Sequence, residues 1–304
     1  MGNTFYFEWE VRAMEWLQSH GNAFLTALAE FFTMFGEEML LIALLGTLYW
    51  SLDKGLGKRL TLSVLTVFIW SALLKGAVLR RRPYMDHEGI DCLKAPHNDG
   101  DLMDPTIQGY SCPSMHSSLS ASGFGTLAYA LRKRVITVLS VLIPLCIGSS
   151  RFYLGVHYPT DVLSGWVLGA LSVLTVQALL DRFGRKRLIY LGILIMALPG
   201  MFYCRDMEYF SCLGVTIGFI GAFAFEERFV GFEGTRVPHK FILRPLFGLV
   251  VFLMISQGLK LPFDREFLAS PTAGAFAVRV FRYAAAVFVS VGVYPLAFDK
   301  SKVI

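Results

Sequence analysis

The sequence predicts an all-α membrane protein, a polytopic transmembrane helical bundle of about nine spans. Its 304 residues are 55% hydrophobic and only 17% charged, with a mean hydropathy of +0.54, which is too apolar for a water-soluble domain of this size. The apolar residues recur in stretches that approach the roughly 20 residues needed to cross a bilayer, separated by short polar or basic connections. A separate soluble domain does not fit between them.

Residues 1–36 are predicted to form an N-terminal interfacial helix region. Residues 1–18 are aromatic and acidic and lack the basic start and the small-residue cleavage site of a signal peptide, so we expect them in the mature chain. The apolar stretch 22–35 is bounded by Gly21 and Gly36, and it either lies in the interface or extends the first span. Trp9, Trp16, Tyr49 and Trp50 are expected in aromatic belts at the membrane surfaces.

Two groups of spans follow. Residues 37–180 form the helical core and residues 181–304 form C-terminal transmembrane helices of unknown role. The Gly165 to Gly169 spacing predicts close helix packing in the fifth span, and Gly214 and Gly218 predict the same in the seventh. The predicted spans are 37–52, 60–79, 115–131, 135–149, 160–180, 188–203, 209–225, 241–259 and 276–298.

The basic residues fix the orientation. With Lys54, Lys58 and Arg59 in the cytoplasm, the basic clusters within 132–134, 182–187, 228–244 and 300–302 also fall there, as the positive-inside rule requires. The net charge of +5 therefore reports topology, and we expect no nucleic-acid partner.

One basic cluster breaks this pattern. The same topology places Lys75 and residues 80–82, three consecutive arginines, on the extracytoplasmic side. Either an anionic group holds them there, or the arginines are a cytoplasmic stop signal and the topology is threaded differently.

Three blocks of polar residues stand at the outer ends of the spans and converge on one membrane face. The first holds Lys75 and Arg82, and the third begins with Arg151. These three cations could neutralise most of a bound phosphate and stabilise charge on its oxygens during reaction.

The second block opens the third span. Pro113 suits the start of a helix, so the amides of Ser114, Met115 and His116 are expected at a helix N-terminus, where phosphate binds readily. His116 is placed to protonate a leaving oxygen as general acid. Simple helix capping is the other interpretation of this block.

The third block continues with His157 and Asp161. The intervening Tyr-Pro-Thr starts the fifth span, so the carboxylate can turn back onto the imidazole, fix its tautomer and leave the other nitrogen free to attack phosphorus. A histidine hydrogen-bonded at a helix start would give the same local pattern.

Together the blocks resemble the type 2 phosphatidic acid phosphatase family, which shares its site with vanadium haloperoxidases and glucose-6-phosphatase. The resemblance covers Lys75 to Asp161 by motif and implies a haloperoxidase-like helical core over residues 37–180. The C-terminal spans make the chain look more like the sphingosine-phosphate phosphatase branch than the short six-span bacterial enzymes.

The resemblance implies a role for each residue of the blocks. His157 would form a phosphohistidine, Asp161 would orient it, and His116 would protonate the leaving group. The phosphate-binding residues would be Lys75, Arg82, Ser114, Met115 and Arg151. The family usually has glycine at the position of Met115, so the backbone there must be compatible with a side chain.

The outer loop 85–110 is rich in His, Asp and Glu, and its members are Asp86, His87, Glu88, Asp91, His97, Asp99, Asp101 and Asp104. We expect a solvated loop rather than a metal site, because no spacing matches a ligand pattern and the implied chemistry needs neither metal nor cofactor. Disulfides between Cys92 and Cys112 and between Cys204 and Cys212 are geometrically feasible.

The sequence thus predicts a metal-independent integral membrane phosphatase for lipid phosphates, with its site on the extracytoplasmic side of the plasma membrane if the source is bacterial. Two alternatives stay open. A lipid phosphotransferase would use an acceptor hydroxyl in place of water, and a lipid transporter or scaffold would explain the four additional spans.

Overall fold

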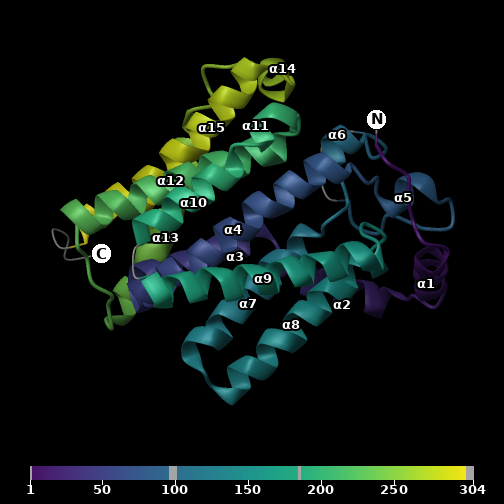
Figure 1. The fold of residues 1–304 in the computed structure, drawn as a ribbon, viewed down its shortest axis with the longest axis horizontal. Helices are drawn as coiled ribbons and strands as arrows, with labels where there is room; N and C mark the ends of the chain where they lie inside the picture. Colours follow the sequence, from purple (N-terminus) through teal and green to yellow (C-terminus); the bar gives the residue numbers. More distant parts are fainter. Residues whose placement is uncertain (1, 96–100, 184–185, 299–304) are drawn as a thin grey trace.

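The computed structural model describes residues 2–95, 101–183 and 186–298. Within these ranges the structure is helical apart from loops and one isolated bridge between Asn3 and Arg80. The all-α prediction is confirmed, and Figure 1 shows a bundle of long helices with the shorter helices α1, α5 and α6 at one end.

The elements up to residue 183 form the N-terminal part and the core. In chain order they are α1 (Glu8–Ser19), α2 (Ala23–Met34), α3 (Glu38–Thr47), the π-helical turn η1 (Leu48–Leu52), α4 (Lys54–Val78), α5 (Pro83–Asp86), α6 (Pro105–Gln108), α7 (Met115–Leu131), α8 (Arg134–Tyr153) and α9 (Pro159–Phe183). The remaining elements are α10 (Lys186–Ala197), α11 (Gly200–Tyr203), α12 (Met207–Phe229), α13 (Pro238–Gly258), α14 (Arg265–Ala269), α15 (Ala273–Val287), η2 (Phe288–Val293) and η3 (Tyr294–Ala297).

The predicted count of nine spans is not confirmed. Within the described ranges, six helices are long and apolar enough to cross a membrane: α4, α8, α9, α12, α13 and the run Ala273–Ala297. The predicted span 115–131 is α7, which has 17 residues, and two others are the shorter apolar helices Leu40–Leu52 and Leu188–Tyr203. The last of these breaks before α11 at Pro199, because proline cannot donate the hydrogen bond that continues a helix.

Glycines bring α9 against α7, as the spacing predicted. A Cβ at Gly165 would lie 2.7 Å from the carbonyl oxygen of Ser114, and one at Gly169 would lie 2.6 Å from the Cβ of Ala121. A larger residue at either position would push α9 away from the start of α7, which carries part of the candidate site.

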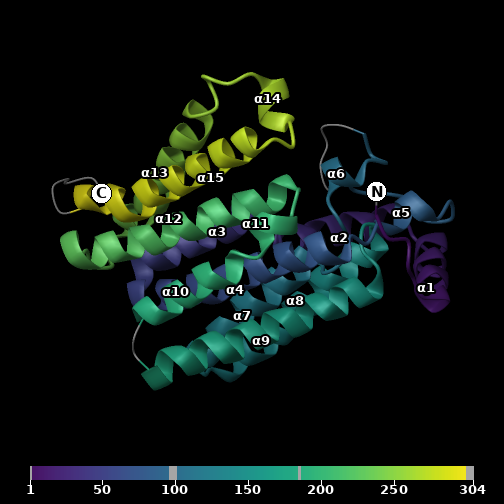
Figure 2. The ribbon, with the colours of Figure 1, turned by 45° about the horizontal axis from the view of Figure 1, so that its top comes forward.

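The C-terminal helices pack in the same way and sit against α4. Cβ atoms at Gly214 and Gly218 of α12 would lie 2.6 and 2.7 Å from carbonyl oxygens of α15. Helix α4 runs between the core and the C-terminal helices (Figure 2). Of the residues in its most apolar stretch, 72% are buried. At the N-terminal end of α4, Lys58 pairs with Glu226 of α12 at 2.7 Å, and both side chains are buried.

The aromatic-belt prediction is wrong for Tyr49 and Trp50. Trp9 and Trp16 are 52% and 61% exposed, but Tyr49 and Trp50 are only 3% and 4% exposed. The π-helical turn η1 directs both rings into a cluster with Phe223 and Phe232, so they pack the interior.

Candidate active site

The C-terminal end of α4 and the starts of α7 and α9 lie at the end of the bundle that carries α1 and α5 (Figures 1 and 2). Helix α4 ends with Leu79 in the left-handed conformation, at φ 53°, which turns the chain into the arginine cluster. Helix α7 begins after Ser114, which caps it by accepting a hydrogen bond from the Ser117 amide. The Ser114 amide donates to the carbonyl of Asp161 at 2.9 Å, which ties the start of α7 to the start of α9.

The structure brings most of the predicted site residues to one cavity of about 500 Å³. Six of the eight line it: Lys75, Arg82, Met115, His116, Arg151 and His157. Ser114 and Asp161 are outside this lining and are fully buried. The three blocks therefore converge in space as their positions in the sequence predicted.

His157 is held by the backbone. Its Nδ1 lies 2.8 Å from the carbonyl oxygen of Ser111, which can only accept, so Nδ1 carries the proton and Nε2 keeps its lone pair. Nε2 lies 3.4 Å from Nη1 of Arg82. Burial, then the charges of Arg82, Arg151 and Lys75, lower the pKa of His157 well below its usual value, so the ring is neutral at pH 7.

Asp161 does not contact His157 in the way the sequence predicted. Its Oδ2 is 3.8 Å from Nδ1, beyond hydrogen-bond reach, and accepts instead from the Tyr158 amide at 2.8 Å. Its Oδ1 pairs with Arg80 at 2.7 Å. The Ser111 carbonyl occupies the position expected for the carboxylate.

The anionic partners expected for the arginine cluster are present. Arg80 joins Asp161 to Glu10 of α1, with 2.7 Å to each, and its guanidinium stacks 3.9 Å from the ring of Tyr158. Arg81 pairs with Asp86 at 3.0 Å. Arg80 thereby attaches the N-terminal helix to the start of α9.

The three cavity cations are held in different ways. Arg82 donates to the carbonyls of Gln108, Gly109 and Val156 at 2.8 to 3.1 Å, which fixes its fork. Arg151 donates from Nη1 to the Thr33 hydroxyl, while its buried Nε has no hydrogen-bond partner among the described residues. A bound anion would satisfy that donor.

Lys75 has an unexpected partner. Its ammonium lies 2.9 Å from both carboxylate oxygens of Glu208, which is in the first turn of α12. A phosphate that binds Lys75 must share it with this carboxylate.

The start of α7 accommodates both residues that follow Ser114. Met115 is 6% exposed and packs with Leu119 in the main apolar cluster, so the side chain at the family's usual glycine position is tolerated. His116 packs against Gly36, where a Cβ would lie 2.8 Å from the imidazole Cδ2. The Ser114 hydroxyl accepts from the Ser117 amide at 3.4 Å, so the structure shows it as a cap, and it also accepts from Ser117 Oγ at 2.9 Å.

Three parts of the site were not predicted from the sequence: Ser111, Glu208 and the wall contributed by the C-terminal helices. That wall includes Ser211, Val215, Arg279 and Tyr283. A backbone carbonyl such as that of Ser111 has no signature in a sequence. Glu208 had one, since it is an acid at the same membrane face as Lys75 in the predicted topology.

Two other expectations concern the outer loop and the cysteines. No group of three or more His, Cys, Asp or Glu residues suited to a metal ion occurs within the described ranges, and His97 and Asp99 lie outside them. Both suggested disulfides are wrong, because all five cysteines are free. The sulfur of Cys112 faces Ser164 Oγ at 3.8 Å, and that of Cys204 faces the carbonyl of Ala72 at 4.0 Å.

Fold and site together define a polytopic helical membrane protein with a neutral histidine among buried cations, in a cavity of about 500 Å³. Comparison with known families agrees. Residues 57–185 match the PAP2 superfamily, and residues 210–303 match the transmembrane extension of PAP2 superfamily phosphatases. The chain belongs to the PAP2 superfamily and is a membrane phosphatase, and its C-terminal helices correspond to that extension.

Two curated proteins are similar to parts of the chain. The undecaprenyl-diphosphatase of Sulfolobus acidocaldarius is 28% identical over 157 residues, which are 51% of this chain and 71% of that protein. The phosphatidylglycerophosphatase B of Bacillus subtilis is 34% identical over 87 residues, which are 26% of this chain and 43% of that protein.

Among solved structures, a transmembrane PAP2-type phosphatidylglycerolphosphate phosphatase from Bacillus subtilis matches with a TM-score of 0.45 and 24% identity. The match covers 59% of this chain and 90% of that chain.

Proposed function

We propose that the protein hydrolyses lipid phosphates without a metal, through a phosphohistidine on His157. One observation carries this assignment: the Ser111 carbonyl holds the proton on Nδ1, so that Nε2 keeps a lone pair within a cavity that Arg82, Arg151 and Lys75 line. A neutral imidazole that is already oriented needs no base to activate it.

The residues divide the reaction into two displacements. In the first, Nε2 of His157 attacks phosphorus, the bond from phosphorus to the lipid oxygen breaks, and His116, which enters this step as the imidazolium, gives its proton to that oxygen and becomes neutral. In the second, water attacks phosphorus, His116 takes a proton from the water, and the bond to Nε2 breaks to release phosphate. Arg82 and Arg151 stabilise charge on the phosphate oxygens in both steps.

The assignment of a lipid phosphate as substrate and the assignment of the site to one side of the membrane are supported by different observations. The two curated relatives are named for an undecaprenyl diphosphate and a phosphatidylglycerophosphate, so we extend the lipid phosphate class to this chain. Basic residues such as Lys58, Arg59 and Arg134 lie at the end of the bundle opposite the cavity, which favours a site on the extracytoplasmic face. In a bacterial source this face belongs to the plasma membrane.

The test is phosphate release by the purified protein in detergent micelles containing excess chelator. The panel holds polyprenyl, phosphatidyl and sphingoid phosphates, and each is measured beside His157→Ala and the control His239→Ala, whose histidine is exposed. We expect chelator-resistant release that His157→Ala abolishes and His239→Ala retains. Release that survives in folded His157→Ala would overturn the assignment.

A labelling experiment tests the intermediate itself. Substrate carrying a labelled phosphate, quenched within the first turnover, should leave acid-labile label on the wild-type chain and none on His157→Ala. An added lipid alcohol would reveal the phosphotransferase alternative, because part of the label would then appear on the alcohol rather than in free phosphate.

A further inference from the structure

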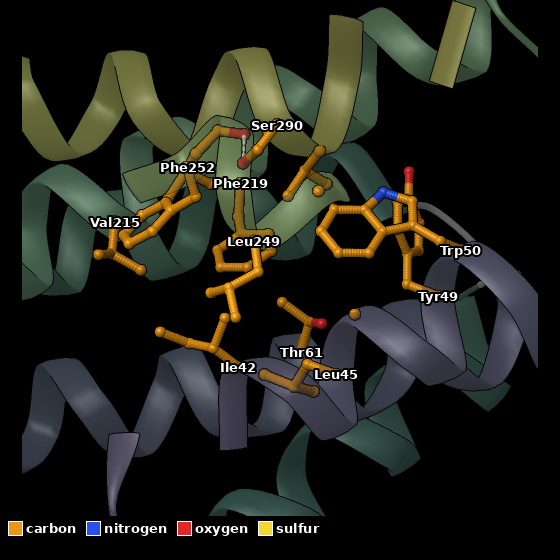
Figure 3. Close-up of a pocket in the computed structure, with 14 residues that line it drawn as sticks. Ile42, Leu45, Tyr49, Trp50, Thr61, Val215, Phe219, Leu249, Phe252 and Ser290 are labelled. Atoms are coloured by element: carbon orange, nitrogen blue, oxygen red, sulfur yellow. Dashed lines mark hydrogen bonds between the residues drawn. The ribbon is translucent and has the colours of Figure 1, made fainter. Parts of the chain in front are cut away.

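A second cavity lies between the core and the extension, deeper in the bundle than the candidate active site. It measures about 60 Å³, and nearly all of its lining is carbon. Figure 3 shows Ile42, Leu45 and Thr61 facing Phe219, Leu249 and Phe252 across it, the first three from α3 and α4 and the others from α12 and α13. The hydroxyl of Ser290 is turned to the backbone carbonyl of Val287 and adds little polarity.

This apolar cavity adjoins the active-site cavity at Val215, which lines both. On α12, Glu208, Ser211 and Val215 line the active-site cavity, and Val215 and Phe219 line the apolar one. Their spacing of three or four residues keeps them on one helix face. One face of α12 therefore leads from a charged end to an apolar end.

Helix α4 repeats the same progression. Lys75 and Phe68 line the active-site cavity and Thr61 lines the apolar cavity, and an interval of seven residues returns to nearly the same face. At 1.5 Å per residue, Lys75 and Thr61 are about 21 Å apart along the helix.

Helix α15 and the turn η2 supply a third such line. Arg279 and Tyr283 line the active-site cavity, while Val287 and Val291 line the apolar cavity. These positions recur every four residues and form one ridge. Three helices thus pass from charged side chains to hydrocarbon in the same direction, on both sides of the boundary between the core and the extension.

We propose that the two cavities form one binding corridor, in which the phosphate lies among the cations and the substrate's own hydrocarbon tail lies between the core and the extension. The proposal rests on the proposed function and adds a role for the extension. Apolar cavities stay dry, and an empty one costs its lining the contacts that a hydrocarbon would supply. A cavity of about 60 Å³ suits part of a single hydrocarbon chain rather than a bulky group, and Val215 marks the point where the chain passes from one cavity to the other.

The experiment is a competition between two substrates with the same phosphate headgroup, one with a long tail and one with a short tail. Both are present in one mixed micelle, so the product ratio reports the ratio of kcat/KM values and does not depend on how much enzyme is active. Leu249→Trp fills the apolar cavity. Val250→Trp is the matched control, because Val250 is the next residue on α13 and is 41% exposed.

Leu249→Trp should lower the preference for the long tail at least about 10-fold, the effect expected when roughly two methylene groups lose their burial. Val250→Trp should keep the wild-type ratio. Phe252→Ala should enlarge the apolar cavity instead of filling it. In a competition between a branched and a straight tail, this variant should raise the relative rate of the branched tail.

An unchanged ratio in folded Leu249→Trp would overturn the corridor and would indicate that the cavity is empty or holds a tail of the surrounding membrane. An equal shift in Val250→Trp would also overturn it. Failure of the proposed function looks different, because the wild-type protein would then release phosphate from neither substrate.

Discussion

Replacing Asp161 with asparagine separates two ways in which this residue could act on His157. In the structure the Ser111 carbonyl, 2.8 Å from Nδ1, fixes the tautomer, and the Asp161 carboxylate stands 3.8 Å away. Asparagine keeps an oxygen for the Tyr158 amide, and Arg80 keeps Glu10 as a partner. The substitution therefore removes charge while leaving the tautomer in place.

The size of the effect follows from the distance. Two unit charges at 3.8 Å interact by about 1 kcal/mol at a dielectric constant of 80 and by about 4 kcal/mol at 20. Arg80 lies 2.7 Å from the same carboxylate and cancels part of its field at the ring. We therefore expect a loss of about 1–2 kcal/mol as His157 becomes phosphorylated and gains positive charge, or roughly 5- to 30-fold in kcat.

The assay is kcat at saturating substrate for the wild-type protein, Asp161→Asn and His157→Ala, with thermal unfolding in detergent as the check on folding. In serine protease triads, where the carboxylate itself fixes the tautomer, the same change costs about 10⁴-fold. A loss of that size in folded Asp161→Asn would refute the reasoning and would mean that the carboxylate reaches Nδ1 during catalysis.

Three other measurements follow from the site. Glu208→Gln frees Lys75 from a partly exposed ion pair and should lower KM about 2- to 5-fold; a raised KM would show that the carboxylate helps to bind substrate. Arg80→Met leaves two buried carboxylates without a cation and should cost about 3–5 kcal/mol in unfolding free energy, whereas Glu10→Gln leaves a neutral pair and should cost less; equal losses of thermal stability would contradict this. Because the pKa of His157 is lowered, Nε2 stays unprotonated as pH falls, so the acid limb of kcat/KM, corrected for substrate ionisation, should lie below pH 6.5; a limb above that value would contradict a depressed pKa.

The convergence of the site could be predicted because its residues stand at helix ends. Lys75 ends one predicted span and His116 begins the next, and once the spans alternate in direction both fall on one face. Chain direction alone is enough for this inference. The close approach of α9 to α7 could likewise be predicted from Gly165 and Gly169, because small residues four apart on one helix face let two helix backbones come close together.

The immediate surroundings of His157 could not be predicted. The group that accepts from Nδ1 of His157 is the backbone carbonyl of Ser111. Every residue has such a carbonyl, so the sequence does not indicate which one will be used. The pairing of Asp161 with Arg80 rather than with His157 depends on where helix α1 places Glu10, which is 70 residues from Arg80 in the chain. The predicted number of spans is not confirmed, because three of the predicted spans are shorter helices, namely α7 with 17 residues, Leu40–Leu52 and Leu188–Tyr203, and hydropathy alone does not fix where a helix ends.

The ion pairs at the two ends of α4 limit how the two halves of the protein can be recombined, both in engineered chimeras and in evolution. Lys58 pairs with Glu226 at one end and Lys75 with Glu208 at the other, and both acids belong to α12. Because the two ion pairs are so far apart, they fix the register of α4 against α12 along the helix axes. A chimera that joins this catalytic half to the C-terminal helices of a relative must carry both matching acids, or it will leave a buried lysine uncompensated. The two halves are therefore expected to have been inherited as one unit.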